Sequence, residues 1–375
     1  MPMKSVIKDS PVIISPYYTQ NVTFAKRRDH DFLAVVKKRV YEEFKRRGLS
    51  PYANGAMILK TLSILAAYAV CVAAIFSDYF GPSGVILWYA ALGFVCSMNG
   101  LNIAHDAMHG SYFRSQRLNK WLAYFFDFNS TSSFIWRISH NTYHHIYTNI
   151  PGLDNDIDKG SLLRLQPTDP LLKFHYWQNW YAIPLYTLLT FNWAWISDIY
   201  WCVKEHRKGK VTHREAAVFF AFKAANLLVF VILPMILLSV SWWVPLVGYL
   251  LLHMTAGVVS GTVFQLGHVV EGVEFVVPDD EGNLPYDWAL HEMLTTSNCC
   301  TKSHWVTHWV GGLNFQIEHH LFPNICHVHY LWICDIVKQT AEEFNFPYKD
   351  IPTFRGAVAS HLRALKKLGR QTHWP

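Results

Sequence analysis

The sequence predicts an all-α integral membrane protein in which four transmembrane helices form two hairpins and a helical cytoplasmic cap holds a histidine-rich site. Three observations lead to this prediction: long apolar runs, few charged residues, and histidines that gather outside the runs. Only 16% of the 375 residues are charged, against about 25% in soluble domains. Aromatic residues make up 15%, and their rings favour the membrane–water interface.

The apolar runs approach the length of about 20 residues that a membrane-spanning helix needs. They cover residues 56–76, 83–103, 216–240 and 244–266. Because the connections after residues 76 and 240 are too short for a domain, each pair of runs is expected to form a helical hairpin. Lys60, near the start of the first run, can extend its amine to the headgroups.

The basic residues predict the orientation of these spans. Neither hairpin connection contains Lys or Arg, whereas the two terminal segments and the middle segment hold nearly all of them. Positive residues favour the cytoplasmic side of a membrane. We therefore expect a cytoplasmic basic arm at 1–55, a membrane domain at 56–323 and a cytoplasmic C-terminal tail at 324–375. Both termini and the histidine-rich site would face the cytoplasm.

Three segments outside the spans can also be interpreted. The N-terminal stretch MPMKSVIKDS has no apolar run, so no cleavable signal peptide is expected. Phe32–Arg47 reads as a basic amphipathic helix, either solvated or lying on the cytoplasmic leaflet. The segment 179–202, from Asn179 to Cys202, is apolar and aromatic but contains a proline and an aspartate. It is expected either to span the membrane or to lie at its interface.

Charge and cysteine content narrow the class of protein. The net charge of +6 fits attraction to anionic membrane lipids, and no basic run is dense enough to predict nucleic-acid binding. The seven cysteines are scattered without a CxxC motif, which favours reduced thiols facing the cytoplasm.

Three clusters contain the most informative of the 20 histidines. Residues four apart share one face of a helix, so the HxxxH and HxxxHH spacings present paired imidazoles. Adjacent histidines diverge by about 100° on a helix and can reach two metals, or one metal from two sides. The clusters are formed by His105 and His109, by His140, His144 and His145, and by Gln316, His319 and His320.

These clusters predict a metal centre at one side of the membrane. Imidazole suits iron, copper, zinc and nickel, and the absence of cysteine from the clusters disfavours structural zinc. They supply more imidazoles than one ion can hold, so two neighbouring metals are the economical interpretation. His105 follows the second run and His268 follows the fourth, which places all candidate ligands on the same predicted side. A lone histidine is more often an ordinary surface or core residue than a metal ligand, but three clusters with this spacing favour a metal site.

Further histidines show no comparable pattern: His253, His291, His304, His308, His327 and His329. The pair at 304 and 308 is interpreted as structural, and the pair at 327 and 329 as surface residues or as support for the ligands. The acidic stretch 154–158 resembles a calcium loop but lacks Gly at its sixth position and Glu at its twelfth. It is interpreted as a turn near the site, whose carboxylates could support the ligands.

At these residues the chain resembles the membrane fatty acid desaturase family, and specifically its front-end, linoleoyl-CoA or delta-6-like members of bacterial type. Three stretches within about 56–323 carry the resemblance: HDAMHG from His105, HNTYHHIYTN from His140 and GGLNFQIEHHLFP from Gly311. The last is the most specific, because Gln316 opens the third box where many other desaturases have His.

The resemblance implies a non-haem di-iron centre of two Fe ions with O2 as co-substrate, acting on an acyl-CoA or acyl-lipid. Gln316 would be either a neighbour of the iron or a weak ligand, and Asn141 and Asp106 would support the ligands. The implied ligands are His105, His109, His140, His144, His145, His268, His319 and His320. No HPGG motif of a fused cytochrome b5 is present. Electrons are therefore expected from a separate ferredoxin, or from cytochrome b5 with its reductase.

The expected chemistry sets demands on the rest of the chain. An unactivated methylene has no acidic proton, so its oxidation needs a strong oxidant that irons and O2 can supply. An apolar tunnel lined by the spans and by residues 125–134 would hold the acyl chain, because misplacement slows reaction steeply. On charge alone, Arg114, Arg117 and Lys120 could contact the headgroup, although a solvated face explains them more simply.

Three other functions are compatible with parts of the same sequence pattern. A membrane di-iron acyl hydroxylase or monooxygenase would share the site, and the QIEHH box favours desaturation over it. A membrane metal transporter would place polar ligands inside the spans, whereas these clusters lie outside them. A structural membrane protein gives no reason for the clusters.

Overall fold

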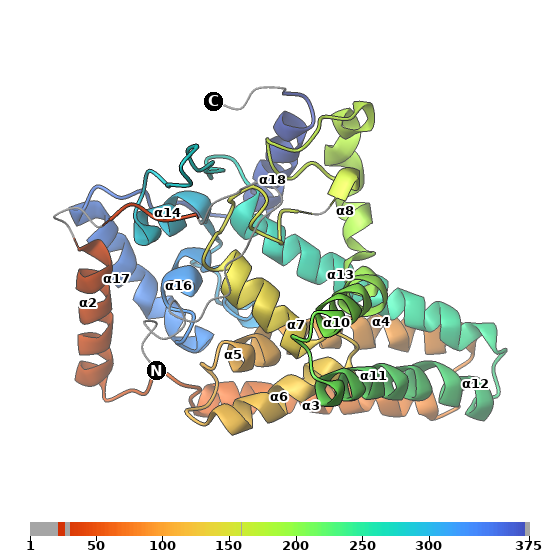
Figure 1. The fold of residues 1–375 in the computed structure, drawn as a ribbon. Helices are drawn as coiled ribbons and strands as arrows, with labels where there is room; N and C mark the ends of the chain where they lie inside the picture. The colour runs from red at the N-terminus through yellow and green to blue at the C-terminus, as the bar shows by residue number, and fades with distance from the viewer. Residues whose placement is uncertain (1–21, 27–30, 159, 372–375) are drawn as a thin grey trace.

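The computed structural model describes residues 22–26, 31–158 and 160–371, so the N-terminal stretch expected to lack a signal peptide falls outside the described residues. The described chain is almost entirely helical, as predicted. Two short strands, β1 (Asn298–Cys299) and β2 (Asp350–Ile351), pair in parallel. All seven cysteines are free. Figure 1 shows long helices extending to one side and shorter helices gathered at the other.

Within the part of the chain that the structure describes, four helical stretches are long and apolar enough to cross a membrane, which confirms the prediction of four spans. Two of them, Pro82–Met108 and His213–Leu237, each contain a π-helical turn. Their component helices are α3 (Gly55–Phe76), α4 (Pro82–Asn99), α5 (His105–Met108), α11 (His213–Leu227), α12 (Leu233–Leu237) and α13 (Trp243–His268).

The ends of three spans differ from the prediction. The second span does not stop at residue 103, because the π turn Gly100–Ala104 continues it into α5. The third begins at His213 rather than at residue 216, because Thr212 and Glu215 form a capping box. The fourth continues past residue 266 to His268. At the ends of the second and fourth spans, which carry histidines, the residues are polar, so a hydropathy pattern does not show that the helix continues.

Helices α4 and α13 form the central pair of the bundle. A Cβ atom on Gly93 of α4 would lie 2.2 Å from the backbone oxygen of Leu252, so only glycine allows this approach. The hydroxyl of Tyr89 donates to the backbone oxygen of Phe230 at 2.7 Å and ties α4 to the third span. The close backbone contact between α4 and α13, together with the hydrogen bond from α4 to the third span, therefore fixes the positions of the two spans that end near the histidines.

Two lysines within the spans are buried. A lysine at position 60 can extend to the headgroups, but in the structure the amine of Lys60 lies 3.2 Å from Nε2 of His327 in the interior. Lys223 donates to the backbone oxygen of Ser130 and lies 3.5 Å from a carboxylate oxygen of Asp198. Each lysine therefore connects a span to the segments that carry the histidines.

Helix α2 (Phe32–Arg47) has the predicted bounds and packs against α17 (Tyr330–Glu343). Its apolar residues are buried there, so protein rather than the lipid leaflet covers this face. The guanidinium of Arg39 binds the carboxylate of Glu343 at 2.7 Å on the same contact. The structure therefore supports neither sequence alternative fully, because the partner of the amphipathic face is another helix.

The segment from Asn179 to Cys202 does not form a continuous helix of spanning length. It is divided among α8 (Gln178–Tyr186), α9 (Leu189–Asn192), a π turn (Trp193–Ser197) and α10 (Asp198–Arg207). Trp180, Ile196 and Tyr200 are 74%, 58% and 63% exposed. Helix α8 runs across the direction of α3 and α11 (Figure 1). These features favour the interfacial alternative.

The remaining helical segments of the described chain include three 3-10 turns at Gly160–Leu162, Lys173–Trp177 and His327–His329. The helices are α6 (Gln116–Phe128), α7 (Ser133–Ile138) with its π turn Ser139–His144, α14 (Trp288–Thr295), α15 (His304–Val310), α16 (Gln316–Leu321) and α18 (Phe354–Leu368). Of these, α14, α16 and α18 gather near the end of α13, and α6 runs along α3 and α11 (Figure 1).

Candidate metal centre

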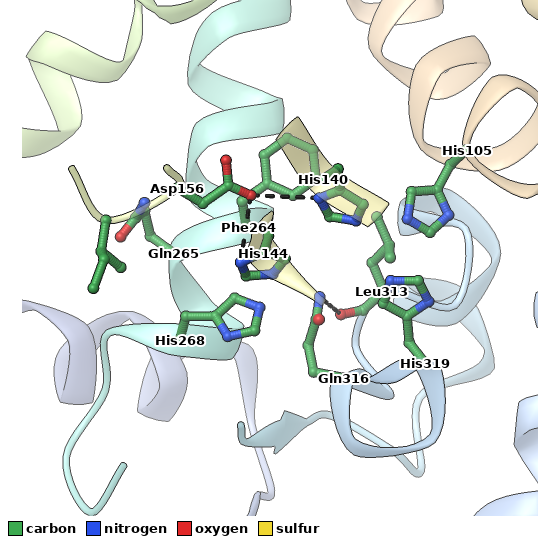
Figure 2. Close-up of a pocket in the computed structure, with 11 residues that line it drawn as sticks. His105, His140, His144, Asp156, Phe264, Gln265, His268, Leu313, Gln316 and His319 are labelled. Atoms are coloured by element: carbon green, nitrogen blue, oxygen red, sulfur yellow. Dashed lines mark hydrogen bonds and ion pairs between the residues drawn. The ribbon is translucent and has the colours of Figure 1, made fainter. Parts of the chain in front are cut away.

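The predicted histidines meet where α5, the π turn after α7, the end of α13 and α16 converge (Figure 2). All except His109 are buried, and His109 is partly buried. Segments far apart in the sequence therefore present imidazoles to one interior space. The set brought together is His105, His109, His140, His144, His145, His268, His319 and His320.

The imidazole nitrogens form two groups with the spacing of metal ligands. Within each group, one nitrogen of every residue lies within 4.8 Å of the others. The first group contains His105, His109, His140 and His319. The second contains His144, His268 and His320. His145 lies between them, because its ring centroid is 4.6 Å from that of His319 and 4.3 Å from that of His320.

The π turn Ser139–His144 explains why all three histidines of the second box face the site. The backbone N–H of His145 donates to the oxygen of His140, five residues earlier, at 2.9 Å. This brings the two Nε2 atoms to 3.1 Å. On an α-helix, residues five apart point about 140° away from each other, so His145 would not approach His140. A π turn realigns residues five apart, and such turns are frequent at functional sites.

Carboxylates hold the far nitrogen of three imidazoles. Nδ1 of His144 lies 3.0 Å from Asp154, and Nδ1 of His140 lies 3.4 Å from Asp156. The acidic turn is therefore beside the site, as interpreted from the sequence. Glu292 accepts from Nδ1 of His320 at 2.7 Å. Such bonds fix the tautomer and leave Nε2 for a metal.

Burial controls the protonation of the cluster. It lowers the pKa of His140, His145, His319 and His320 well below the ordinary value, and the neighbouring imidazoles lower it further. Neutral imidazole is the form that binds metal. Burial raises the pKa of Glu292, and a cation bound at His320 would favour its carboxylate form.

The nitrogens that face the shared space fit a metal. Among the described residues no hydrogen-bond partner lies near Nε2 of His105, His109, His319 or His320. A buried polar atom without a partner costs about 1–3 kcal/mol, and several lone pairs facing one another suit a cation. The donors are all imidazole, a set that suits iron, copper, zinc or nickel. Four nitrogens in one group and three in the other can hold two ions.

Of the residues expected to support the ligands, Gln316 borders the space between the histidines, whereas Asn141 does not contact a ligand nitrogen. Gln316 borders the same space as the histidines, and its Nε2 donates to the backbone oxygen of Leu313 at 2.8 Å (Figure 2). Asn141 donates to the backbone oxygen of Met108 at 3.2 Å. Asn141 thus joins the first box to the second rather than contacting a ligand nitrogen.

Asp106 belongs to a separate buried group beside the cluster. It accepts from Nδ1 of His327 at 2.8 Å and from the thiol of Cys326 at 3.0 Å. His327 is therefore buried, and the surface alternative for it is wrong. His329 is buried too, with Nε2 at 3.1 Å from the backbone oxygen of Tyr52. These contacts fasten the first box to the segment after the third.

The third box is anchored by its own acidic residue. The carboxylate of Glu318 accepts from the amide of Asn298 at 2.8 Å and from the hydroxyl of Tyr348 at 2.9 Å. Burial raises the pKa of Glu318 to about 7. Gly311 has a φ of 65°, and a Cβ atom there would lie 2.1 Å from the backbone oxygen of Leu101. The loop before the box therefore needs glycine.

The other histidines remain outside the two groups. His304 and His308 are exposed on α15, in keeping with their structural interpretation. His291 is buried with Nε2 at 2.7 Å from the backbone oxygen of Thr148. His253 is buried in the middle of α13.

Two hollows that share lining residues lie beside the cluster. A cleft of about 710 Å³, here called the long cleft, runs between α7, the segment 162–165, α8 to α10 and α13. A smaller inner hollow of about 50 Å³ extends between α4 and α13. Trp136, Trp193 and Phe264 line both, and His105 lines the inner hollow. Phe126 and Thr131 also line the inner hollow, so part of the segment 125–134 borders it as predicted.

Comparisons with known proteins agree with this architecture. A profile of the fatty acid desaturase family matches residues 80–352. An sn-1 linoleoyl-lipid 6-desaturase of Synechocystis is 34% identical, covering 94% of this chain and 98% of the relative. Its counterpart in Arthrospira platensis is 35% identical, covering 93% and 95%. An acyl-lipid (8-3)-desaturase of Physcomitrium patens is 34% identical, covering 92% and 73%. The chain therefore belongs to the fatty acid desaturase family and is an oxidoreductase that desaturates fatty acyl chains.

Proposed function

We propose that this protein introduces a double bond near the carboxyl end of an acyl chain carried by a membrane lipid, using two irons, O2 and electrons from a separate carrier. The convergence of the imidazoles into two groups supports the di-iron centre. The relatives named as lipid desaturases support the acyl-lipid substrate. When bound, the irons and O2 supply an oxidant strong enough to remove hydrogen from an unactivated methylene.

Each metal position has its own imidazole set in this proposal. The first ion would be held by the group that includes His105 and the second by the group that includes His268. His145, between the groups, would complete either set. The carboxylates of Asp154 and Glu292 keep a proton on the Nδ1 atoms of His144 and His320, which directs each Nε2 inward.

The hollows supply the acyl site. The acyl chain would lie in the long cleft, and Trp136 and Phe264, which line both hollows, would guide its carbons to the cluster beside His105. Bulky apolar walls exclude water and hold two neighbouring carbons close to the metals, because a small misplacement slows reaction steeply. Ferredoxin, or cytochrome b5 with its reductase, would deliver the electrons.

We further propose that the cluster and both termini face the cytoplasm. The connections at the far ends of the hairpins contain no Lys or Arg, and basic residues favour the cytoplasmic side. The arm 1–55 and the tail 324–375 would then be cytoplasmic, flanking a membrane domain at 56–323. Labelling of single cysteines introduced at residues 79 and 355 should show them on opposite sides of the membrane.

The test of the metal centre is His144→Ala, with His304→Ala as the matched control on exposed α15. The His144 variant should insert into the membrane but bind no iron and form no product, whereas the control should resemble wild type. Iron content and double-bond positions are read by mass spectrometry after expression in a host with defined fatty acids. A product carrying an added oxygen would contradict desaturation, and full activity of His144→Ala would contradict the ligand set.

A further inference from the structure

We infer that His361 is a positioning residue that holds both the backbone beside His268 and the wall of the long cleft at Tyr186. This inference rests on the proposed function, which makes His268 a metal ligand and the long cleft the acyl site. His361 belongs to α18 and is fully buried. Helix α18 packs against α8 and against the end of α13 (Figure 1).

Both ring nitrogens of His361 have a partner. Nδ1 lies 2.6 Å from the backbone oxygen of Val269, and Nε2 lies 2.8 Å from the hydroxyl of Tyr186. Because a carbonyl oxygen can only accept, Nδ1 carries the proton and Nε2 accepts from the hydroxyl. Burial lowers the pKa of His361 to about 4, which keeps the ring in this neutral form. One imidazole therefore joins two segments that are far apart in the sequence.

The ring of His268 depends on the backbone for its position. Its Nδ1 has no hydrogen-bond partner among the described residues, whereas carboxylates hold the rings of three other ligands. His268 is the last residue of α13, and Val269 follows it directly. The hydrogen bond from His361 to Val269 therefore fixes the chain one residue beyond the ligand.

Further contacts hold the turn that follows the ligand. The hydroxyl of Ser360 on α18 accepts from the backbone N–H of Glu271 at 2.9 Å. The guanidinium of Arg363, also on α18, binds the carboxylate of Glu271 at 2.6 Å. The backbone oxygen of His268 itself accepts from the amide of Asn149 at 2.8 Å. The turn is thus held from two sides, by α18 and by the segment after the second histidine box.

Tyr186 connects the same imidazole to the long cleft. It lines this cleft and is buried on α8. Two glycines of α13 allow α8 to cross closely here, since a Cβ atom on Gly257 would lie 2.6 Å from the backbone oxygen of Tyr186. A Cβ atom on Gly261 would lie 3.0 Å from the Cβ of Tyr186. The backbone of Tyr186 is therefore seated against α13, and the bond to His361 fixes the far end of its ring.

Two substitutions of His361 separate its two contacts. In His361→Asn the amide nitrogen can replace Nδ1 and keep the bond to Val269, but the side chain is too short to reach Tyr186. In His361→Gln the amide oxygen can replace Nε2 and accept from Tyr186, but the bond to Val269 is lost. Tyr186→Phe removes the hydroxyl alone and tests the contact with the cleft a second time.

The experiment measures iron release and KM on purified full-length protein. Iron is measured by plasma mass spectrometry after dialysis against graded chelator, and KM with linoleoyl phosphatidylglycerol and an electron donor that supports turnover. His361→Gln should release iron at a roughly threefold lower chelator concentration, below the 10–100-fold loss for residues that contact a ligand, with KM unchanged. His361→Asn and Tyr186→Phe should hold iron as wild type does and raise KM about threefold, the effect of losing one neutral hydrogen bond.

The matched control is His175→Gln, which alters another buried histidine, whose Nε2 lies 2.7 Å from the backbone oxygen of Ser161. It should lower Tm in detergent without releasing iron. Equal release of iron by His361→Asn and His361→Gln, or unchanged iron and KM in both, would overturn the inference, because a merely structural histidine does not separate the two readouts. Absence of product from wild type would instead count against the proposed function, and iron release would still decide the contact beside His268.

Discussion

Replacing Glu292 by glutamine tests how the protein supports its metals. Glu292 is fully buried, and one of its oxygens accepts from Nδ1 of His320 at 2.7 Å and from the hydroxyl of Thr148 at 3.0 Å. Glutamine has the same shape and can keep both contacts through its amide oxygen. With a metal bound at His320, the change therefore removes the negative charge behind the imidazole and puts an NH2 group in place of the second oxygen, which has no hydrogen-bond partner among the described residues.

The magnitude follows from that loss of charge. A hydrogen bond to a charged group contributes about 1.5–3 kcal/mol, and a neutral one about 0.5–1.5 kcal/mol. The difference of about 1–1.5 kcal/mol corresponds to roughly tenfold weaker iron binding, at the low end of the 10–100-fold range found for residues that support metal ligands. We expect Glu292→Gln to release iron at a roughly tenfold lower chelator concentration, with a parallel loss of activity.

The matched control is Glu318→Gln, which alters an equally buried carboxylate bound to Asn298 and Tyr348 instead of a histidine. Since burial raises the pKa of Glu318 to about 7, a neutral side chain should be tolerated there. Iron content is measured by plasma mass spectrometry after dialysis against graded chelator. The reasoning fails if Glu292→Gln holds iron as tightly as wild type, or if both variants lose it equally.

Three further predictions follow from packing and charge. Gly93→Ala should lower the free energy of unfolding by about 1–3 kcal/mol, because its Cβ would lie 2.2 Å from the oxygen of Leu252; an unchanged Tm in detergent would contradict this. Lys223→Met should cost about 3–5 kcal/mol by leaving Asp198 buried and unpaired, and adding Asp198→Asn should recover part of the Tm. Metal-free protein should lose stability as pH falls below about 6.5, since burial holds the pKa of the clustered histidines below that of the unfolded chain, which takes up protons first; equal Tm values at about pH 7.5 and 5.5 would refute it.

The sequence predicts the membrane part of the fold well, because span length and hydropathy are local properties. The four apolar runs are confirmed as helices, and Phe32–Arg47 has its predicted bounds. The fate of Lys60 could not be predicted in this way, since its partner His327 is remote in the sequence. Likewise, hydropathy cannot detect that the π turn Gly100–Ala104 continues a span into the first histidine box.

At the site, regular spacing identifies the ligands but not what surrounds them. The histidines four apart, His105 and His109, lie with ring centroids 4.6 Å apart as expected for a helix. The approach of His145 to His140 depends on a π turn that has no spacing signal. Glu292 is a single acidic residue in α14, and only the folded structure places it behind His320. The clefts likewise arise from segments that meet only after folding.

The anchoring of Glu318 has a consequence for biosynthesis. When the third box has just emerged from the ribosome, the nascent chain contains every imidazole of the cluster. It still lacks Tyr348, whose hydroxyl binds Glu318 in this box. Iron retention should therefore begin only when the last helices have been made. Loss of iron after truncation behind the QIEHH sequence would then report missing anchors, among them Tyr348 and His327, rather than a missing ligand.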